Sequence, residues 1–408
     1  MISRTDRQKE GIKKWIQTGC KGTLCYFPGF GKTRCALIAI NKVIRAKPDA
    51  KILVSVPTDV LKEQWLESIN KYGFQNNVQV QIINTVVKHE WDVDLLVQDE
   101  CHICPTVTFS EVFNCVHYNM ILCLTGTLER LDGKEVLVKA YAPVVDKITR
   151  EEGMLYGWTS PAKEYVVMLD VDLSDYNKWN QEFIGFFSQI GYDFNLGMTL
   201  TTNIIERRKY AKKLGLDQKQ FDAVCFGWMD RLRKRKMFVQ SHPKKFEIAR
   251  KILDARKDKK CITFSATIKD SEKLATKNEY VLHSKKSKKQ NDAILEEFNS
   301  KQTGVLNTSK ACDVGVDIKG LSVGIILSTD SSQIRKNQRF GRILRYEPGK
   351  IAELFTLVIK GTVEEKWFAN SASGNYIVIN EQQLEKVLNN EPLEVRERKI
   401  TKDVKNRY

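Results

Sequence analysis

A glycine-rich segment near the start of the chain has the residue types of a phosphate-binding loop. Residues 28–33 read Pro-Gly-Phe-Gly-Lys-Thr, after an apolar run and before a helix-like stretch. Gly29 and Gly31 let backbone N–H groups close around phosphates at a helix N-terminus. Lys32 can neutralise the β and γ phosphates, and Thr33 can offer a hydroxyl to Mg²⁺. The segment therefore predicts a site for a nucleoside triphosphate and its metal ion.

An acidic motif at residues 99–102, Asp-Glu-Cys-His, follows the apolar run Leu-Leu-Val at 95–97. In a parallel sheet, ligands bind where the strands have their carboxyl ends. Asp99 is therefore positioned to hold Mg²⁺ through its water shell. Glu100 is the natural general base for the attacking water, because phosphoryl transfer needs an oriented nucleophile and compensated charge.

A third motif, at residues 338–345, places two arginines one helical turn apart in the sequence Gln-Arg-Phe-Gly-Arg-Ile-Leu-Arg. Arg342 and Arg345 can share one helix face and reach the γ phosphate together. Arginine suits this task because its planar, always charged fork compensates charge spread over several phosphoryl oxygens. Alone, an arginine-rich helix is most often a solvated face. Beside the two motifs of the first half, it predicts a pair of arginine fingers.

Short apolar runs rich in β-branched residues must position these motifs. They alternate with helix-like stretches, which predicts a parallel sheet with covering helices. In the first half the runs fall at 22–27, 51–56, 80–83, 94–98 and 120–124. The rhythm returns at 261–264, 280–282, 304–307, 323–327 and 353–359. We expect two α/β domains in tandem, because 408 residues with 42% apolar content can fill two cores.

The stretch at 161–240 has a different character, with a helix-like pattern and few strand signals. Residues 196–260 hold 19 Lys and Arg against 7 Asp and Glu, whereas residues 1–160 hold 20 against 18. The positive charge is therefore concentrated after the first domain. We expect domains at 1–160 and 241–370, a linker with a basic helical insertion at 161–240, and a polar tail at 371–408.

The formal net charge of +16 predicts a surface that attracts a polyanion, such as nucleic acid or an anionic membrane. No apolar run approaches the roughly 18 residues that cross a bilayer, and the first eleven residues are too polar for a secretory signal. These features favour a soluble protein from a reducing compartment, without a membrane partner.

Several cysteines and histidines raise the alternative of a zinc site, since a Cys-x-x-Cys at 101–104 is followed by Cys-x-His at 115–117. The acidic motif already accounts for Cys101 and His102. Thiolate ligation beside Glu100 would also compete for the same loop geometry. We therefore favour core and loop cysteines.

The phosphate loop together with Asp-Glu-x-His resembles the ATPase of superfamily 2 helicases and translocases. Further motifs of that family follow in its order, over about residues 4–368. They are Val-Ser-Val-Pro-Thr at 54–58 with Gln-Trp at 64–65 (motif Ia), Asn-Thr at 84–85 (motif Ic), Leu-Thr-Gly-Thr at 124–127 (motif III), Phe-Ser-Ala-Thr at 264–267 (motif IV), the nonapeptide at 309–317 (motif V) and the arginine-rich motif VI. The resemblance implies tandem RecA-like domains that hydrolyse ATP with Mg²⁺ and act on nucleic acid.

The resemblance also implies roles for single residues. Those assigned to the nucleotide or its hydrolysis are Gln8, which reads adenine, Gly315 and Asp317, which approach the ribose, and Gln338, Arg342 and Arg345. Those assigned to coupling the ATP site to nucleic acid are His102, Thr125 and Thr127. Those assigned to the nucleic-acid backbone are Pro57, Thr58, Thr85, Ser265 and Ser309.

Two basic runs in the middle segment, at 207–213 and 231–236, lie near aromatic residues at 226, 228 and 238. Arg233, Lys234 and Arg235 belong to the denser run. Such runs can follow a phosphate backbone with strongly salt-dependent affinity. A solvated helix face is the alternative interpretation.

The nearest groups within the family are UvsW-like, RecG-like and XPB-like proteins, because motif V opens with Ser-Lys. They imply a monomeric ATP-dependent DNA helicase or translocase that remodels forks, branch-migration or recombination intermediates in the cytoplasm of a bacterial or phage-infected cell. DNA is thus the expected partner. Three alternatives stay open: an RNA helicase, a motor subunit of a restriction or defence complex, and a nucleotide-switched binding module.

Overall fold

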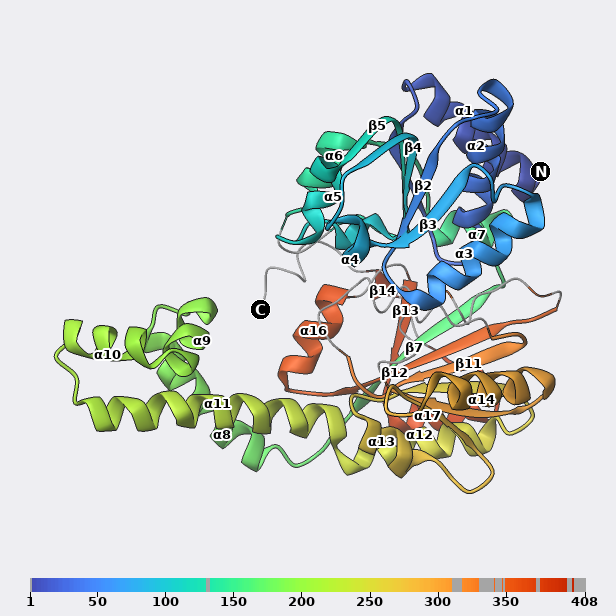
Figure 1. Ribbon diagram of the computed structural model, residues 1–408. Coiled ribbons are helices and arrows are strands. Elements are labelled where there is room, and N and C mark those ends of the chain that lie inside the picture. Colours follow the sequence, from blue (N-terminus) through green and yellow to red (C-terminus); the bar gives the residue numbers. More distant parts are fainter. Residues whose placement is uncertain are drawn as a thin grey trace.

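The computed structural model describes residues 2–129, 133–309, 318–329, 341, 347, 349–371, 375–394 and 398–399. Two α/β domains, each built on a mainly parallel sheet, lie next to each other, and a helical arm projects from the second (Figure 1). The expected pair of tandem sheet domains is confirmed. None of the described helices has the length and apolar character needed to span a bilayer.

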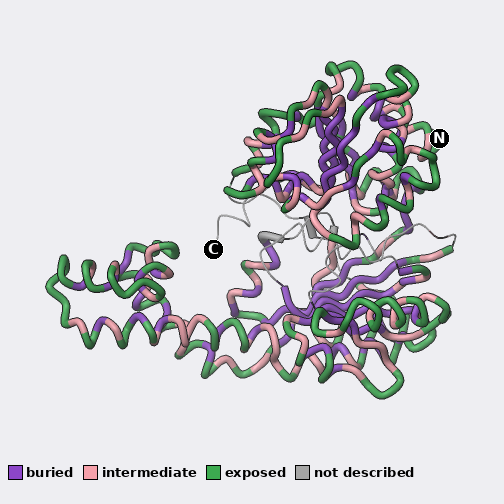
Figure 2. Tube along the Cα trace, in the orientation of Figure 1, coloured by how far each residue is buried: buried purple, intermediate pink, exposed green. Residues whose placement is uncertain are grey.

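The first sheet has six parallel strands in the order β3-β2-β4-β5-β1-β6. Their bounds are β1 (Lys21–Tyr26), β2 (Ile52–Val56), β3 (Val78–Ile82), β4 (Trp91–Gln98), β5 (Val116–Thr125) and β6 (Val144–Ile148). The carboxyl halves of the inner strands are buried, as Figure 2 shows, because helices cover both faces of the sheet. The continuous apolar runs of the sequence fit this double burial.

The helices of the first domain divide between the two faces of its sheet. One core cluster joins the sheet to α1 (Arg4–Gln17), α2 (Lys32–Ala46) and α3 (Asp59–Tyr72). A second cluster lies on the other face, with α4 (Ile83–Val86), the 3₁₀ turns η1 (Cys101–Ile103) and η2 (Phe109–Glu111), α5 (Val112–Cys115) and α6 (Val136–Tyr141). The short helix α7 (Arg150–Leu155) follows β6.

The second sheet has eight strands in the order β14-β13-β7-β12-β11-β8-β10-β9, and only β14 runs antiparallel to its neighbour. Its strands are β7 (Ala162–Leu169), β8 (Lys260–Phe264), β9 (Tyr280–Leu282), β10 (Gly304–Thr308), β11 (Leu321–Ile326), β12 (Ala352–Ile359), β13 (Asn375–Ile379) and β14 (Arg398–Lys399). The helices of this domain are α12 (Pro243–Ala255), α13 (Ile268–Leu274), α14 (Lys288–Ser300), α16 (Val363–Ser371) and α17 (Glu381–Leu388).

Two segments lie in this sheet that the sequence analysis placed outside it. β7 falls within 161–240, where we expected a linker and helical insertion, and it pairs with β12 along its whole length. β13 and α17 fall within 371–408, where we expected a polar tail, and β13 pairs with β7. The chain therefore begins the second domain before it enters the arm. Its C-terminal part returns to complete the sheet.

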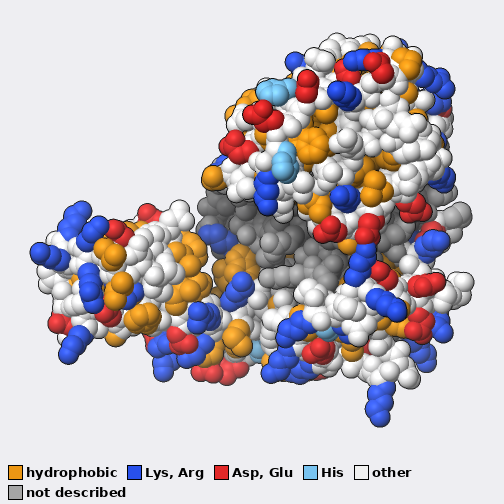
Figure 3. All heavy atoms as spheres, in the orientation of Figure 1, with side chains coloured by type: hydrophobic (Ala, Val, Ile, Leu, Met, Phe, Trp, Pro, Cys, Tyr) orange, Lys and Arg blue, Asp and Glu red, His pale blue; other side chains and the backbone are white. Residues whose placement is uncertain are grey.

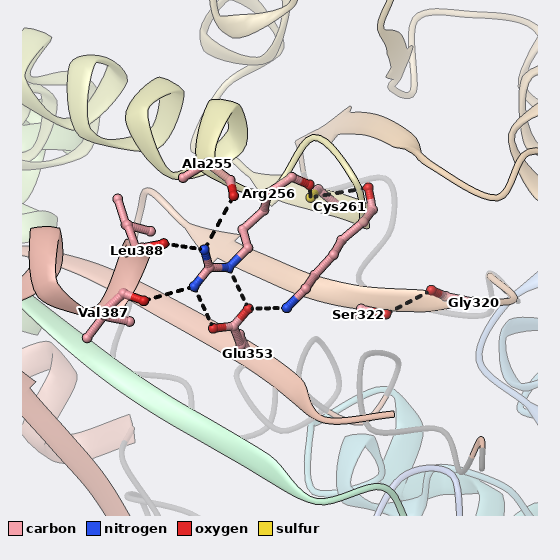
Figure 4. Close-up of polar contacts among 9 residues, drawn as sticks. Ala255, Arg256, Cys261, Gly320, Ser322, Glu353, Val387 and Leu388 are labelled. Carbon is pink, nitrogen blue, oxygen red and sulfur yellow. Dashed lines mark hydrogen bonds and ion pairs between the residues drawn. The ribbon is translucent and has the colours of Figure 1, made fainter. Parts of the chain in front are cut away.

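A buried ion pair attaches α17 to the sheet. The Arg256 guanidinium, 3% exposed, donates to the two carboxylate oxygens of Glu353 at 2.8 and 3.1 Å. It also donates to the backbone carbonyls of Val387 and Leu388 at 3.1 and 2.9 Å, at the end of α17 (Figure 4). Lys259 adds a third contact, 2.8 Å from Glu353. These bonds cap the last turn of the helix with a cation, which also suits its dipole.

The arm consists of α8 (Ser174–Gln189), α9 (Phe194–Thr202), α10 (Ile204–Lys213) and α11 (Gln218–Ser241). It has a small core of its own around Trp228, whose ring centroid lies 5.3 Å from those of Phe183 and Phe186. Gly197 is needed there, because a Cβ at this position would lie 2.7 Å from the Trp228 ring. The arm returns through α11, which leads into α12 with only His242 between them.

Replacing Arg256 with Ala should destabilise the second domain by about 3 to 5 kcal/mol, because the buried Glu353 loses its bidentate partner. Chemical denaturation followed by circular dichroism measures the loss. Lys251→Ala, which removes an exposed ion pair to Glu385, is the matched control and should shift the midpoint far less. Equal shifts in the two variants would contradict the anchoring role of Arg256.

Candidate functional site

The phosphate loop connects the carboxyl end of β1 to the N-terminus of α2. Gly29 and Gly31 have φ angles of 92° and 97°, a region that glycine enters without steric cost. Gly31 is also the N-cap of α2, and no side chain caps the helix there. The N-terminal turn thus presents its backbone N–H groups in the way that anion sites do. Lys32 and Thr33 occupy the first two positions of the helix.

Helix α1 lies over this loop. Gln8, 2% exposed, donates from Nε2 to the carbonyl of Phe30 at 2.8 Å. Arg4, one turn earlier, donates to the same carbonyl at 2.9 Å and also to the carbonyl of Gly29. The Gln8 Oε1 atom is buried and has no hydrogen-bond partner among the described residues. The structure therefore places the predicted adenine-reading residue against the phosphate loop, with an acceptor still available.

Asp146, on β6, holds α1 in this position. Its carboxylate accepts from Arg7 at 2.5 and 2.9 Å, from Lys14 at 2.8 Å and from the Tyr26 hydroxyl at 2.7 Å. Burial alone would raise the pKa of Asp146, but the bonds from Arg7 and Lys14 hold it below its usual value. Tyr26 stands where the full phosphate-loop pattern has a first glycine. Here its ring joins the loop to α1 and β6.

The acidic motif meets the phosphate loop at the same sheet edge. Lys32 Nζ lies 3.7 Å from Glu100 Oε1. Glu100 has a φ of 48°, a left-handed conformation that is unusual for a residue with a side chain. Strain of this kind is often kept at functional sites. The predicted general base therefore lies beside Lys32, the residue predicted to contact the phosphates.

Asp99 is 4% exposed, and both of its carboxylate oxygens are engaged. Oδ2 accepts from the indole N–H of Trp65 at 2.9 Å, and Oδ1 accepts from the backbone N–H of Glu100 at 2.9 Å. Burial, and after it the negative charge of Glu100, raise the pKa of Asp99 to about 6. A carboxylate under this electrostatic load is stabilised by a nearby cation.

The residues predicted to couple the ATP site to nucleic acid form one chain of contacts. His102 Nδ1 lies 3.2 Å from Glu100 Oε2 and 3.1 Å from the hydroxyl of Thr125. The Thr125 hydroxyl in turn donates to the carbonyl of Thr127 at 2.7 Å. The acidic motif after β4 is therefore connected to motif III at the end of β5, the neighbouring strand.

The cysteines of the zinc alternative, Cys101, Cys104 and Cys115, belong to the core of the first domain. Cys101 and Cys104 are buried in the core of the first domain together with Cys123. Burial raises the pKa of both the Cys101 and the Cys104 thiol well above the usual value, which opposes thiolate formation. Within the part of the chain that the structure describes, no group of three or more His, Cys, Asp or Glu side chains could hold a metal ion.

The predicted nucleic-acid contacts of the first domain follow β2 and β3. Pro57 and Thr58 directly follow β2, and Thr58 caps α3 by accepting from the Leu61 N–H at 3.4 Å. Thr85 lies on α4, directly after β3. All three are partly exposed. They share the carboxyl edge of the sheet with the phosphate loop and the acidic motif.

In the second domain, Ser265 and Ser309 follow the neighbouring strands β8 and β10. The Ser265 N–H donates to the carbonyl of Thr308 at 2.8 Å, so the two serines lie close together. Both serines are at most 5% exposed. Their predicted contact with the nucleic-acid backbone therefore requires the surrounding residues to move. The remaining predicted nucleotide residues lie outside the described residues: Gly315, Asp317, Gln338, Arg342 and Arg345.

Gly341 shows how closely motif VI approaches the phosphate loop. A Cβ on Gly341 would lie 2.2 Å from the Cβ of Pro28 and 3.1 Å from its carbonyl oxygen. In the other direction, a Cβ on Gly29 would lie 3.4 Å from the carbonyl of Gly341. The backbones of the two domains are therefore in contact beside the phosphate loop. Glycine is required at 341 because any side chain would separate them.

The structure of the arm corrects one predicted nucleic-acid contact, that of Arg235. Arg235 is 9% exposed, and its guanidinium lies 4.1 Å from the ring centroid of Phe183, inside the arm. A side chain in this position cannot follow a phosphate backbone, because its charge is used to hold α8 against α11. Arg233 and Lys234 are exposed, and Lys234 pairs with Asp230 at 2.8 Å on the same helix.

For three residues of this site, no role was predicted from the sequence. Arg4 lies one helical turn before Gln8, and this spacing is a signal that could have identified it. Trp65 was part of motif Ia, but its partner Asp99 is 34 residues away. Asp146 carries no local signal, since its partners Arg7 and Tyr26 are 139 and 120 residues away.

Comparison with known families agrees with this geometry. Residues 5–104 match the DEAD/DEAH box helicase family, and residues 244–347 match the helicase conserved C-terminal domain. The two matches contain the phosphate loop with its acidic motif and the motifs of the second domain. The chain is thus a member of helicase superfamily 2, and it is an ATP-hydrolysing enzyme. The resemblance that the sequence suggested is confirmed.

Individual relatives are similar over different lengths. The DNA 3'-5' translocase XPB2 of Sulfurisphaera tokodaii is 26% identical over 89% of this chain and 83% of its own. The probable helicase D10 of Escherichia phage T5 is 30% identical over 28% of each chain. Among solved structures, S. cerevisiae Dbp5 bound to RNA and ADP BeF3 aligns over 94% of this chain and 92% of that one, with a TM-score of 0.60 and 13% identity. That likeness confirms the fold of tandem helicase domains.

Glu100→Gln should lower kcat for ATP hydrolysis by about 10²- to 10⁴-fold, because an amide cannot accept a proton from the attacking water. Binding of a fluorescent ATP analogue should persist. Phosphate release and analogue fluorescence measure the two effects. Glu111→Gln, at an exposed carboxylate of the same domain, is the control and should leave both unchanged. Wild-type turnover in the Glu100 variant would refute the assignment of the base.

Gly341→Ala should lower kcat by about 10²-fold, because the added methyl group forces the two domain backbones apart at Pro28 and misplaces the reacting groups. Affinity for ATP should fall less than kcat, since Lys32 and its loop are intact. Gly227→Ala provides the control, because a Cβ on this helical glycine of the arm meets no atom within 4 Å. A Gly341 variant with normal kcat would show that this close approach is not needed for hydrolysis.

Proposed function

We propose that this superfamily 2 enzyme is a DNA helicase or translocase that moves on duplex DNA and remodels branched DNA such as forks and recombination intermediates. Its similarity to a DNA translocase over most of both chains supports DNA as the substrate. The similarity to a phage T5 helicase supports a bacterial or phage-infected cell. We propose that the enzyme acts there in the cytoplasm and as a monomer.

The observation that carries the proposal is the basic surface of the arm. It is formed by the exposed residues Arg208, Lys209, Lys212, Lys213, Lys219, Arg233, Lys234 and Lys236. Lys and Arg side chains are prominent on the projecting arm in Figure 3. Duplex DNA carries one negative charge per about 1.7 Å of its axis. A separate basic element of this kind can hold the duplex while the two sheet domains carry out the nucleotide cycle.

In the proposed cycle, ATP binds between the phosphate loop and motif VI. Lys32 contacts the phosphates from the first domain, while Arg342 and Arg345 reach them from the second. The contact between Gly341 and Pro28 supports this arrangement, because Gly341 directly precedes Arg342. ATP binding closes the two domains on each other, and hydrolysis releases them. Each cycle moves the enzyme one step along a strand.

Thr33 and Asp99 fit a Mg²⁺ ion, since a hydroxyl and a carboxylate are the hard oxygen ligands that this ion prefers. Thr33 and Asp99 lie on two segments that meet, because their neighbours Lys32 and Glu100 are 3.7 Å apart. When bound with the nucleotide, Mg²⁺ compensates the negative charge of the β and γ phosphates. Asp99 would hold the ion, and Glu100 would orient the attacking water.

The remaining predicted residues take their roles from this cycle. Gln8 Oε1 can accept a hydrogen bond from the adenine amino group, and Gly315 and Asp317 would approach the ribose. Residues proposed to contact the nucleic-acid backbone are Pro57, Thr58 and Thr85 in the first domain and Ser265 and Ser309 in the second. Contacts from both domains let their relative motion become movement along the strand.

The choice of nucleic acid is tested by stimulation of ATP hydrolysis. We expect forked and duplex DNA to raise kcat more than single-stranded RNA or an RNA duplex of equal length. The rates are measured at one fixed salt concentration, because phosphate contacts make affinity salt-dependent. Stimulation by RNA alone would overturn the proposal in favour of an RNA helicase.

Replacing Arg208, Lys212 and Lys213 with Gln should weaken DNA binding and lower the slope of log affinity against log salt by about 0.9 for each phosphate that is no longer neutralised. Fluorescence anisotropy at several salt concentrations measures both quantities. A matched variant replaces Lys13, Lys42 and Lys71, which are exposed on helices of the first domain. If both triple variants lose affinity equally, net charge rather than the arm explains the binding.

A further inference from the structure

Trp65 is fully buried, and its indole N–H donates to a carboxylate although a backbone carbonyl would satisfy it equally well. Its side chain is 1% exposed and packs in the core cluster between the sheet and α1 to α3. A buried indole N–H needs an acceptor, and any backbone carbonyl satisfies it. Trp15, in the same cluster and also 1% exposed, donates to the carbonyl of Ile121 at 2.9 Å. Trp65 instead donates to the Asp99 carboxylate.

This bond fixes the orientation of Asp99. Trp65 holds Oδ2 and the Glu100 N–H holds Oδ1, each at 2.9 Å, so rotation of the carboxylate would break both bonds. The tryptophan ring is itself held by the surrounding core and cannot follow such a rotation. A group that donates to a metal-binding carboxylate typically sets both its direction and its affinity for the ion.

The bond also joins Asp99 to helix α3, which carries Trp65. Thr58 caps the N-terminus of α3, and Trp65 lies two turns further along the same helix. On the following turn from Thr58, Glu63 forms an ion pair with Lys288 of α14, in the second domain. Helix α3 therefore contacts the proposed nucleic-acid edge, the second domain and the Asp99 carboxylate. A shift of this helix displaces the indole N–H and with it the carboxylate.

We propose that Trp65 is a positioning residue, which orients the Asp99 carboxylate for Mg²⁺ and transmits movement of α3 to it. This inference rests on the proposed function, because it takes Asp99 as the Mg²⁺-holding residue and Thr58 as a nucleic-acid contact. It is a connection separate from the contacts of His102 with Thr125. One connection acts through the acid that holds the metal ion, the other through the general base.

The test compares W65F with W15F in the full chain. Each variant keeps an aromatic ring in the same core cluster and removes one buried N–H donor, but only W65F affects Asp99. Without nucleic acid, the Mg²⁺ concentration that gives half-maximal binding of a fluorescent ATP analogue should rise about 10- to 100-fold in W65F. It should stay within about twofold of wild type in W15F. Thermal unfolding should show similar losses of stability in both variants.

A second readout follows the connection through α3. In W65F, the ratio of kcat with DNA to kcat without DNA should fall at saturating Mg²⁺, while the affinity for DNA is unchanged. In W15F the ratio should remain that of wild type. An equal rise in the Mg²⁺ requirement of both variants, or no rise in either, would overturn the proposal. A normal stimulation ratio in W65F would remove the transmitting role.

Two features keep the test decisive. The Mg²⁺ titration uses no nucleic acid, so it stands even if no DNA stimulates the wild-type enzyme, an outcome that counts against the proposed function alone. If W65F does not fold, benzothienylalanine at position 65 replaces the N–H with sulfur and keeps the shape of the ring. The same rise in Mg²⁺ requirement is then expected, and a wild-type requirement would overturn the proposal.

Discussion

Parallel strands end at a common edge, and this constraint gathers the groups of the site. β1, β2, β4 and β5 of the first sheet deliver the phosphate loop, motif Ia, the acidic motif and motif III to one edge. The contacts of Lys32 with Glu100 and of His102 with Thr125 exist because of that arrangement. The second sheet repeats it with Ser265 after β8 and Ser309 after the neighbouring strand β10.

Around this edge, buried charges and dipoles hold the phosphate loop and helix α1 together. The Asp146 carboxylate holds α1, and through it Gln8 and Arg4 hold the carbonyls of the phosphate loop. Such a network is strong because its members lie away from water, where an unmade bond costs the full desolvation of the group. The same principle applies in the second domain, where Arg256 and Glu353 hold the C-terminal helix.

The sequence was sufficient to predict those parts of the site whose residues are neighbours along the chain. The phosphate loop, the acidic motif and the strands before them are local patterns, and the fold class and the enzyme class followed from them. It was insufficient where the partner is distant. β7 was missed because Lys163 and Glu164 interrupt its apolar run, although pairing with β12 determines its place. Arg235 looked like a surface cation because the rings that enclose it come from α8, some fifty residues earlier.

A rotation of the second domain displaces the far end of the projecting arm, because the arm is rigidly connected to that domain. α11 has 24 residues, which at 1.5 Å per residue gives a rod of about 36 Å. Its inner end continues into α12, whose residues Ile248, Ile252 and Leu253 are part of the second domain's core. A rotation of the second domain by roughly 10° therefore displaces the far end of the arm by about 6 Å, close to two base-pair steps of about 3.4 Å. The length of α11 thus determines how far the end of the arm moves for a given small rotation.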